Sequence, residues 1–315
     1  MLDQAPEQVK RIACIGAGPI GGGWAAHFLA QGYEVTSYLH AASEFDALMR
    51  LLETAWESLE QIGLVDGASM DNFNWTTDLG EATEHCEFIQ ESVPEILQLK
   101  QGLYQTLGDI VDPRVVIGSS TSGLSMTDIQ AQCSTPERTV VAHPFNPPYL
   151  LPLVEMIGGE KTAPRTVEWT ERFYRVAGKA PLVMKKEIPG FIATRLQEAI
   201  WREALHMVAN GEASVEQIDQ AVVNGPGPRW ALMGPCEIFH VGGGEGGMAY
   251  CLDQFGPALK LPWTRLVAPE LTDELRNAMV DGCVEMTAGQ DFATLSKKMN
   301  DGLVEIAKMK RKAQN

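Results

Sequence analysis

Apolar runs of strand length alternate with amphipathic stretches of helical length over the first 187 residues. Short strand-like segments, several of them apolar, predict strands near residues 11–15, 34–38, 75–77, 88–90, 115–118, 139–142, 153–157 and 181–184. Longer segments between them predict helices near residues 20–31, 42–62, 95–110 and 165–176. Because strands that alternate with helices form an open, mostly parallel sheet, this part of the chain is expected to be an α/β domain with a doubly wound sheet.

The pattern changes to helices alone after residue 187. A long amphipathic helix is expected from Gly190 to Ala209, with Asn210-Gly211 as its stop. Ser214 and Gln217 have the spacing of a capping box that opens the next helix. We therefore predict two domains, an α/β domain at 1–187 and an all-α domain at 188–315.

Composition narrows the classes of partner. The formal net charge of −16 argues against a surface that binds nucleic acid, which needs clustered Lys and Arg. Hydrophobic residues make up 45% of the chain, yet no apolar run approaches the roughly 20 residues that cross a bilayer, so no membrane is expected. The six cysteines form no CxxC pair, and the first ten residues contain no signal-peptide core. A cytoplasmic protein with reduced thiols is expected.

A glycine-rich turn follows the first predicted strand and opens the first predicted helix. Its pattern GxGxxG in this context is typical of a Rossmann-type dinucleotide site, with the helix N-terminus facing the pyrophosphate. The expected cofactor-binding residues of the turn are Gly16, Gly18, Pro19, Ile20 and Gly21.

One part of such a site is missing from the sequence. An acidic residue is expected at the end of the second strand, where it would accept hydrogen bonds from the ribose hydroxyls. Leu39 occupies that place and cannot accept them. No Arg lies between Leu39 and Ser43 to hold the 2′-phosphate of NADP, so NAD is the expected cofactor. His40 or Ser43 could supply the substitute contacts.

A histidine and a carboxylate follow on neighbouring predicted strands. His143 lies in the run Ala142–Pro148, and Glu155 lies in the next strand. An imidazole whose second nitrogen is held by a carboxylate can take a proton near neutral pH. Together with a nicotinamide that takes a hydride, the pair predicts the oxidation of an alcohol.

The motifs in this order resemble those of the 3-hydroxyacyl-CoA dehydrogenase family. The run at 143–148 with its downstream Glu155 carries most of the resemblance, with the serine-rich loop at 119–124 and the segment 189–196. The resemblance implies that His143 is the general base, Glu155 its orienting partner and Ser122 a contact to the substrate oxygen. Thr194 stands where the family usually has Asn, so it keeps a donor but is shorter.

The same resemblance assigns binding residues around the pair. It places Glu95, Lys100 and Ser120 against the cofactor, and Phe145 and Asn146 against the substrate. A homodimer held by the helical domain is also implied by the family.

Two stretches of the second domain, 224–235 and 240–248, resemble the carnitine 3-dehydrogenase branch of this family and, more distantly, lambda-crystallin and L-gulonate 3-dehydrogenase. The branch implies a small cationic 3-hydroxy acid as substrate, and aromatic faces bind a quaternary ammonium group. The candidates are Trp201, Trp230 and Phe255, with Tyr250 and Trp263 as further aromatics and Arg229 as a partner for the substrate carboxylate.

Two alternatives stay open at this point. The protein could oxidise another 3-hydroxy acid, such as L-gulonate, 3-hydroxybutyrate or a 3-hydroxyacyl-CoA. It could also be a crystallin-like structural protein that binds a dinucleotide without turnover.

Overall fold

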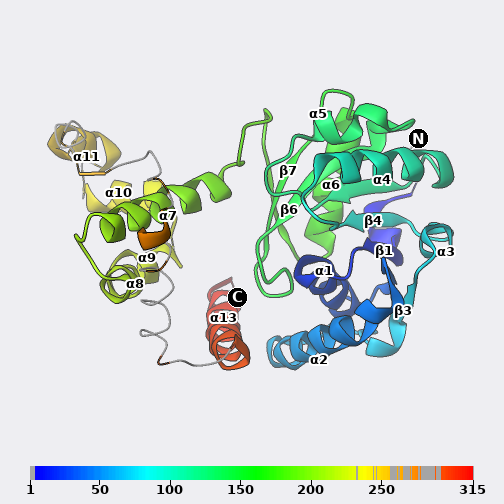
Figure 1. The fold of residues 1–315 in the computed structure, drawn as a ribbon, viewed down its shortest axis with the longest axis horizontal. Coiled ribbons are helices and arrows are strands. Elements are labelled where there is room, and N and C mark those ends of the chain that lie inside the picture. The colour runs from blue at the N-terminus through cyan, green and yellow to red at the C-terminus, as the bar shows by residue number, and fades with distance from the viewer. Residues whose placement is uncertain are drawn as a thin grey trace. The chain divides into compact units, whose positions relative to one another are not determined.

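The computed structural model describes residues 4–314 except 232, 244, 246, 256–260, 262, 265–269, 271, 276, 278–287 and 289–291. Contacts divide the chain into two units (Figure 1). The first comprises Met1–Thr194 together with Met299–Asn315, and the second is Arg195–Lys298. The end of the chain therefore groups with the N-terminal unit, whereas the hydrophobic pattern predicts one C-terminal domain from residue 188.

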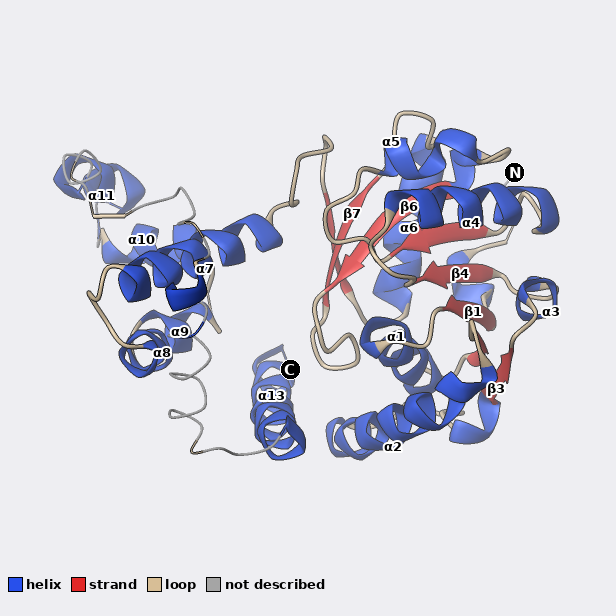
Figure 2. Cartoon of the chain, in the orientation of Figure 1, coloured by secondary structure: helices blue, strands red, loops and turns tan. Residues whose placement is uncertain are grey.

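An eight-stranded sheet forms the centre of the first unit, in the order β3-β2-β1-β4-β5-β6-β7-β8 (Figure 2). The strands are β1 (Arg11–Ile15), β2 (Glu34–Tyr38), β3 (Phe73–Thr76), β4 (Phe88–Glu91), β5 (Val116–Ser119), β6 (Thr139–Pro144), β7 (Leu153–Ile157) and β8 (Ala180–Val183). All neighbouring pairs are parallel except β6 and β7. The connection at 145–152 is too short for the crossover of a dozen or more residues that a parallel pair needs.

Helices cover both faces of this sheet. They are α1 (Pro19–Ala30), α2 (Phe45–Ile62), α3 (Leu79–Thr83), α4 (Leu97–Ile110), α5 (Met126–Ile129) and α6 (Pro164–Val176). Short 3₁₀ turns lie at Pro6–Gln8, Ala42–Glu44, Met70–Asn72, Gln130–Gln132 and Pro136–Arg138. One apolar cluster joins α1, α2 and α6 to the sheet, and a second joins α4 and α5 to it. The predicted doubly wound sheet with flanking helices is confirmed.

The order of the strands marks where a ligand binds. The chain runs outward from β1 to β2 and β3, and then returns to β4 on the other side of β1. Open α/β sheets bind ligands outside the carboxyl ends of the strands at such a switch point. The glycine-rich turn follows β1 directly and lies at this edge.

The second unit is helical. It contains most of α7 (Ala193–Ala209), and α8 (Val215–Asn224), α9 (Pro226–Trp230), α10 (Pro235–Gly242) and α11 (Gly247–Phe255). The predicted capping box is confirmed, because Ser214 accepts from the Gln217 N–H and the Gln217 side chain accepts from the Ser214 N–H. The long helix begins at Ala193 rather than at Gly190, because Gly190 (φ 70°) and Phe191 (φ 50°) adopt left-handed backbone angles that a helix excludes.

The last helix, α13 (Phe292–Gln314), ends in the first unit. There Asn300 donates a hydrogen bond to the hydroxyl of Tyr149 at 3.0 Å. Among the described residues, no helix has both the length and the apolar character needed to cross a membrane.

Candidate active site

His143 and Glu155 are brought together by the one antiparallel strand pair. They occupy opposite positions of β6 and β7, and Nδ1 of His143 lies 3.0 Å from Oε2 of Glu155. The Glu155 side chain is fully buried, and 9% of the His143 side chain is exposed. The other oxygen, Oε1, accepts from the backbone N–H groups of Ile192 and Ala193 at 2.9 and 2.8 Å. Glu155 therefore binds the histidine and the start of α7 at once.

These contacts keep Glu155 ionised. Burial raises the pKa of its carboxyl, but the hydrogen bonds from His143, Ala193 and Ile192 outweigh it, so the pKa lies below its usual value. An ionised carboxylate only accepts hydrogen bonds, so His143 donates its Nδ1–H to it. Nε2 of the neutral imidazole then carries the lone pair that can accept a proton.

Two phenylalanines enclose the imidazole. The ring centroid of His143 lies 5.4 Å from that of Phe145 and 5.5 Å from that of Phe191. Phe191 is 2% exposed and has a positive φ, so it combines a buried side chain with an uncommon backbone angle. Sequence reasoning missed Phe191, although it follows directly on Gly190. Asn146 is exposed and begins a cis peptide bond to Pro147.

Ser122 lies on a loop that Glu95 holds. Glu95 accepts from the hydroxyl of Thr121 at 2.6 Å and from the N–H of Ser122 at 2.9 Å, and it lies 3.4 Å from the Ser122 hydroxyl. Burial raises the pKa of this carboxyl. The hydrogen bonds and the charge of Lys100 outweigh that effect, so the pKa lies below its usual value. The predicted cofactor residue Glu95 thus positions the loop of the predicted substrate residue Ser122.

Lys100 forms a buried ion pair beneath this loop. Its Nζ lies 2.7 Å from Oε1 of Glu91 and 3.5 Å from Oε2 of Glu95, and the Lys100 and Glu91 side chains are 1% and 0% exposed. Glu91 also accepts from the Ser119 hydroxyl at 2.6 Å. Glu91 ends β4 beside the glycine-rich turn, and the family resemblance places it in the loop that borders the nicotinamide but did not predict its ion pair.

The hydroxyl of Ser120 joins a polar cluster beside α1. It accepts from the Trp24 indole at 3.2 Å and from the Gln90 amide at 2.9 Å, and it lies 2.8 Å from the Ser92 hydroxyl. Thr194 lies half-buried in the first turn of α7, next to the N–H groups that cap Glu155. The predicted role of Ser120 in binding the cofactor and that of Thr194 at the substrate oxygen stay predictions.

The glycine-rich turn has the close backbone packing that a dinucleotide site requires. Gly16 has φ +111°, and a Cβ there would lie 2.6 Å from the Ser92 carbonyl oxygen. A Cβ on Gly21 would lie 2.0 Å from the carbonyl oxygen of Gly16, whereas one on Gly18 meets no atom within 4 Å. Pro19 and Ile20 begin α1, so the open space at Gly18 adjoins a helix N-terminus, which favours a pyrophosphate. These residues fit a dinucleotide.

A methyl group on Gly21 is expected to disrupt the turn itself. A methyl group on Gly18 is expected to interfere only with binding of the dinucleotide. Gly21→Ala should lower the melting temperature of the free protein and weaken dinucleotide binding more than tenfold, because the Gly16 carbonyl must move. Gly18→Ala should weaken binding with no change in melting temperature. Calorimetric binding and thermal unfolding measure both effects.

Gly102→Ala is the matched control, since a Cβ there meets no atom within 4 Å and Gly102 lies in α4. Equal melting temperatures for the Gly21 and Gly102 variants would contradict the packing argument.

Leu39 and His40 lie at the end of β2. Leu39 is fully buried in the apolar cluster that joins α1 and α2 to the sheet, and its N–H bonds to the Thr76 carbonyl at 3.0 Å. The His40 side chain is exposed, and its backbone N–H donates to Oε2 of Glu44 at 2.9 Å.

Some of the predicted substrate residues meet in a hollow of the second unit. Arg229 and Trp230 line a space of about 340 Å³ together with Phe239, Ile238 and Cys251. Trp201 lies on α7 and does not line this hollow, and the side chain of Phe255 lies outside the described residues.

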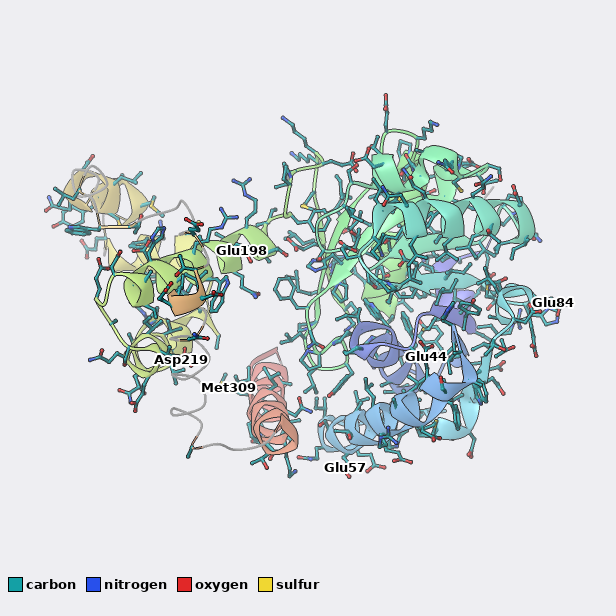
Figure 3. The ribbon with its side chains drawn as sticks, in the orientation of Figure 1. Glu44, Glu57, Glu84, Glu198, Asp219 and Met309 are labelled. Carbon is teal, nitrogen blue, oxygen red and sulfur yellow. The ribbon has the colours of Figure 1, made fainter. Side chains whose placement is uncertain are left out.

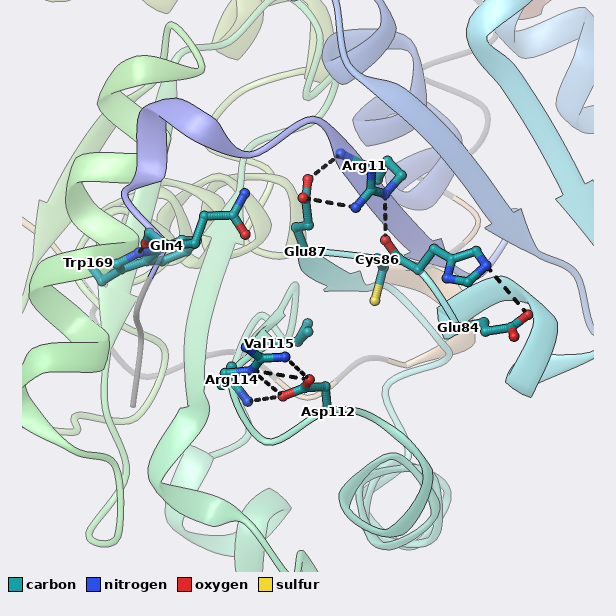
Figure 4. Close-up of a pocket in the computed structure, with 10 residues that line it drawn as sticks. Gln4, Arg11, Glu84, Cys86, Glu87, Asp112, Arg114, Val115 and Trp169 are labelled. Carbon is teal, nitrogen blue, oxygen red and sulfur yellow. Dashed lines mark hydrogen bonds and ion pairs between the residues drawn. The ribbon is translucent and has the colours of Figure 1, made fainter.

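A separate hollow of about 300 Å³ lies at the amino ends of β1 and β5 (Figure 4), the opposite edge of the sheet from the glycine-rich turn. Its charged groups pair with each other: Arg11 lies 3.0 Å from Glu87, and Arg114 lies 2.6 Å from Asp112. It contains none of the residues predicted to act in catalysis.

Family models match almost the whole chain. The NAD binding domain of 3-hydroxyacyl-CoA dehydrogenase matches residues 11–188, and the C-terminal domain of the same enzyme matches residues 190–293. The chain belongs to the 3-hydroxyacyl-CoA dehydrogenase family. The resemblance seen in the sequence is thereby confirmed, and NAD is the cofactor that the glycine-rich turn of this family member fits.

Similar proteins within this family are named for a particular substrate. The chain is 56% identical to an L-carnitine dehydrogenase of Streptomyces coelicolor, over 96% of this chain and 95% of that one. It is 44% identical to an L-carnitine dehydrogenase of Pseudomonas putida, over 95% of this chain and 93% of that one. A solved 5-formyl-3-hydroxy-2-methylpyridine 4-carboxylic acid 5-dehydrogenase, an NAD⁺-dependent dismutase, superposes with a TM-score of 0.81 at 29% identity, covering 96% of this chain and 98% of that one.

Proposed function

We propose that this family member oxidises L-carnitine to 3-dehydrocarnitine with NAD. The observation that carries the proposal is the buried His143–Glu155 pair, with its Nδ1–Oε2 distance of 3.0 Å, in a chain 56% identical to a named L-carnitine dehydrogenase. The intact pair favours an enzyme over the crystallin-like alternative.

His143 and Glu155 have different roles in removing the hydroxyl proton. Nε2 of His143 takes the proton of the C3 hydroxyl, while Glu155 holds Nδ1–H and stabilises the imidazolium that forms. NAD, when bound, accepts the hydride from C3, which leaves a ketone. Ser122 and Thr194 are the proposed donors to the substrate oxygen, and Glu95 fixes the Ser122 loop through the N–H of Ser122 at 2.9 Å.

The cationic end of the substrate is assigned to aromatic side chains of the second unit. A quaternary ammonium group donates no hydrogen bond and is held by aromatic faces. Trp230 and Phe239 line one hollow with Arg229, so the same hollow offers an aromatic surface and a partner for a carboxylate.

A cytoplasmic homodimer is part of the proposal. Apolar side chains lie exposed on helices of the second unit, among them Val223 at 66%, Val241 at 59% and Leu252 at 55%. An apolar surface of this kind is typical of a subunit interface. Each cysteine that the structure describes is free, which agrees with a reducing compartment.

NADH formation with L-carnitine, 3-hydroxybutyrate and L-gulonate tests the proposal. We expect kcat/KM for carnitine to exceed that for 3-hydroxybutyrate by at least about thirtyfold, because a desolvated cation–aromatic contact contributes about 2 kcal/mol or more. Turnover of an uncharged acid alone would move the protein to another substrate within the family. Binding of NAD without turnover of any acid would favour the crystallin-like alternative.

A further inference from the structure

The end of β2 has no acidic side chain for the adenosine ribose. In sheets of this type an acidic residue there binds the ribose hydroxyls. In this chain the residue after β2 is Leu39, which is fully buried among apolar side chains. A carboxylate for the ribose hydroxyls of NAD must therefore come from elsewhere in the chain.

Glu44 supplies a carboxylate next to the end of β2. It ends the 3₁₀ turn Ala42–Glu44 and directly precedes α2, and it is labelled in Figure 3. Its Oε2 accepts the backbone N–H of His40 at 2.9 Å, so the carboxylate folds back onto the residue that follows Leu39.

The same strand end touches the glycine-rich turn. The N–H of Gly16 donates to the carbonyl of Tyr38 at 3.1 Å, so the first glycine and the end of β2 are hydrogen-bonded neighbours. Glu44 is half-buried, and within the described part of the chain no residue donates a hydrogen bond to its Oε1. One oxygen fixes the side chain, and the other is available to a ligand.

We propose that Glu44 is the ribose-binding acid of this chain, in place of residue 39. Its carboxylate accepts from the 2′- and 3′-hydroxyls of the adenosine ribose. The same negative charge repels the 2′-phosphate of NADP, so Glu44 also determines the preference for NAD. His40 and Ser43 carry no negative charge at neutral pH in their ordinary forms and would not supply this repulsion.

Calorimetric binding to the free full-length protein tests this assignment without carnitine or turnover. The ligands are NAD, NADP and ADP-ribose, which has the adenosine half but no nicotinamide. Glu44→Gln is expected to weaken NAD and ADP-ribose equally, by about tenfold or more, since a hydrogen bond to a charged group is lost. The affinity ratio of NADP to NAD should rise by at least the same factor. The amide oxygen introduced by Glu44→Gln can still accept the His40 N–H, so the loop should keep its place.

Asp46→Asn is the matched control. It removes the same charge two positions away, at an exposed site in the first turn of α2. It should leave all three dissociation constants within twofold of the parent, because Asp46 has no proposed contact with the ribose.

Unchanged binding of NAD and ADP-ribose by both Glu44→Gln and Glu44→Ala would overturn the assignment. So would a loss confined to His40→Gln or Ser43→Ala. Because no carnitine is present, either result leaves the proposed oxidation of carnitine untouched. Absence of turnover with carnitine would likewise leave the ribose assignment standing.

Discussion

Replacing His143 with glutamine is expected to lower kcat for carnitine oxidation by about 10³-fold and to leave the dissociation constant for NAD unchanged. General-base catalysis by a positioned side chain contributes about 10²- to 10⁴-fold, and glutamine cannot take up the hydroxyl proton. The amide can still donate to Glu155, so the buried carboxylate keeps a partner where His143 now lies 3.0 Å from it. Steady-state kinetics and calorimetry measure the two quantities.

His85→Gln serves as the control for this change. His85 is exposed and lines the hollow at the opposite edge of the sheet, so its replacement should leave kcat within twofold of the parent. A turnover near that of the parent in the His143 variant would refute the assigned base. A large loss in both variants would point to general destabilisation instead.

Replacing Lys100 with methionine has the largest expected effect on stability. It leaves the fully buried carboxylate of Glu91 without its counter-charge at 2.7 Å. Removing one partner of a buried ion pair costs about 3–5 kcal/mol, because the remaining charge stays desolvated. Urea unfolding followed by fluorescence should show a free energy of unfolding lowered by that amount.

The double variant Lys100→Met/Glu91→Gln separates charge from packing. It removes both charges, so it should recover most of the lost stability, although Glu95 also loses its contact with Lys100 at 3.5 Å. Lys185→Met, at an exposed position, is the control and should change the free energy by less than about 0.5 kcal/mol. Equal losses in the single and the double variant would show that shape rather than charge stabilises this site.

The sequence pattern predicted the sheet because short strand-like segments, several of them mostly apolar such as β1 and β7, alternate with longer helical segments. The sequence could predict that His143 and Glu155 act as a pair, because the motif contains both residues. Its geometry needed the pairing of β6 with β7, which puts the two residues opposite each other.

Burial and long-range contacts of charged side chains could not be predicted in the same way. Nothing in the local pattern distinguishes the buried Lys100 and Glu91 from ordinary surface charges. The contact of Glu44 with His40 depends on how the chain turns after β2, and the left-handed backbone of Phe191 accompanies the packing of its ring beside His143. Such features become visible only when the tertiary structure is known.

The two hydrogen bonds on Oε1 of Glu155 mean that the family's division into domains separates the proposed catalytic pair from two groups that hold it. The match to the NAD binding domain ends at residue 188, but the N–H groups that hold Glu155 belong to residues 192 and 193. A fragment that stops at 188 would keep His143 and Glu155 and lose two of the bonds that fix the carboxylate. The His143–Glu155 pair is therefore fully held only when residues 192 and 193 are present in the chain. A chimera that exchanges helical domains between relatives should keep these residues from the same parent as the sheet.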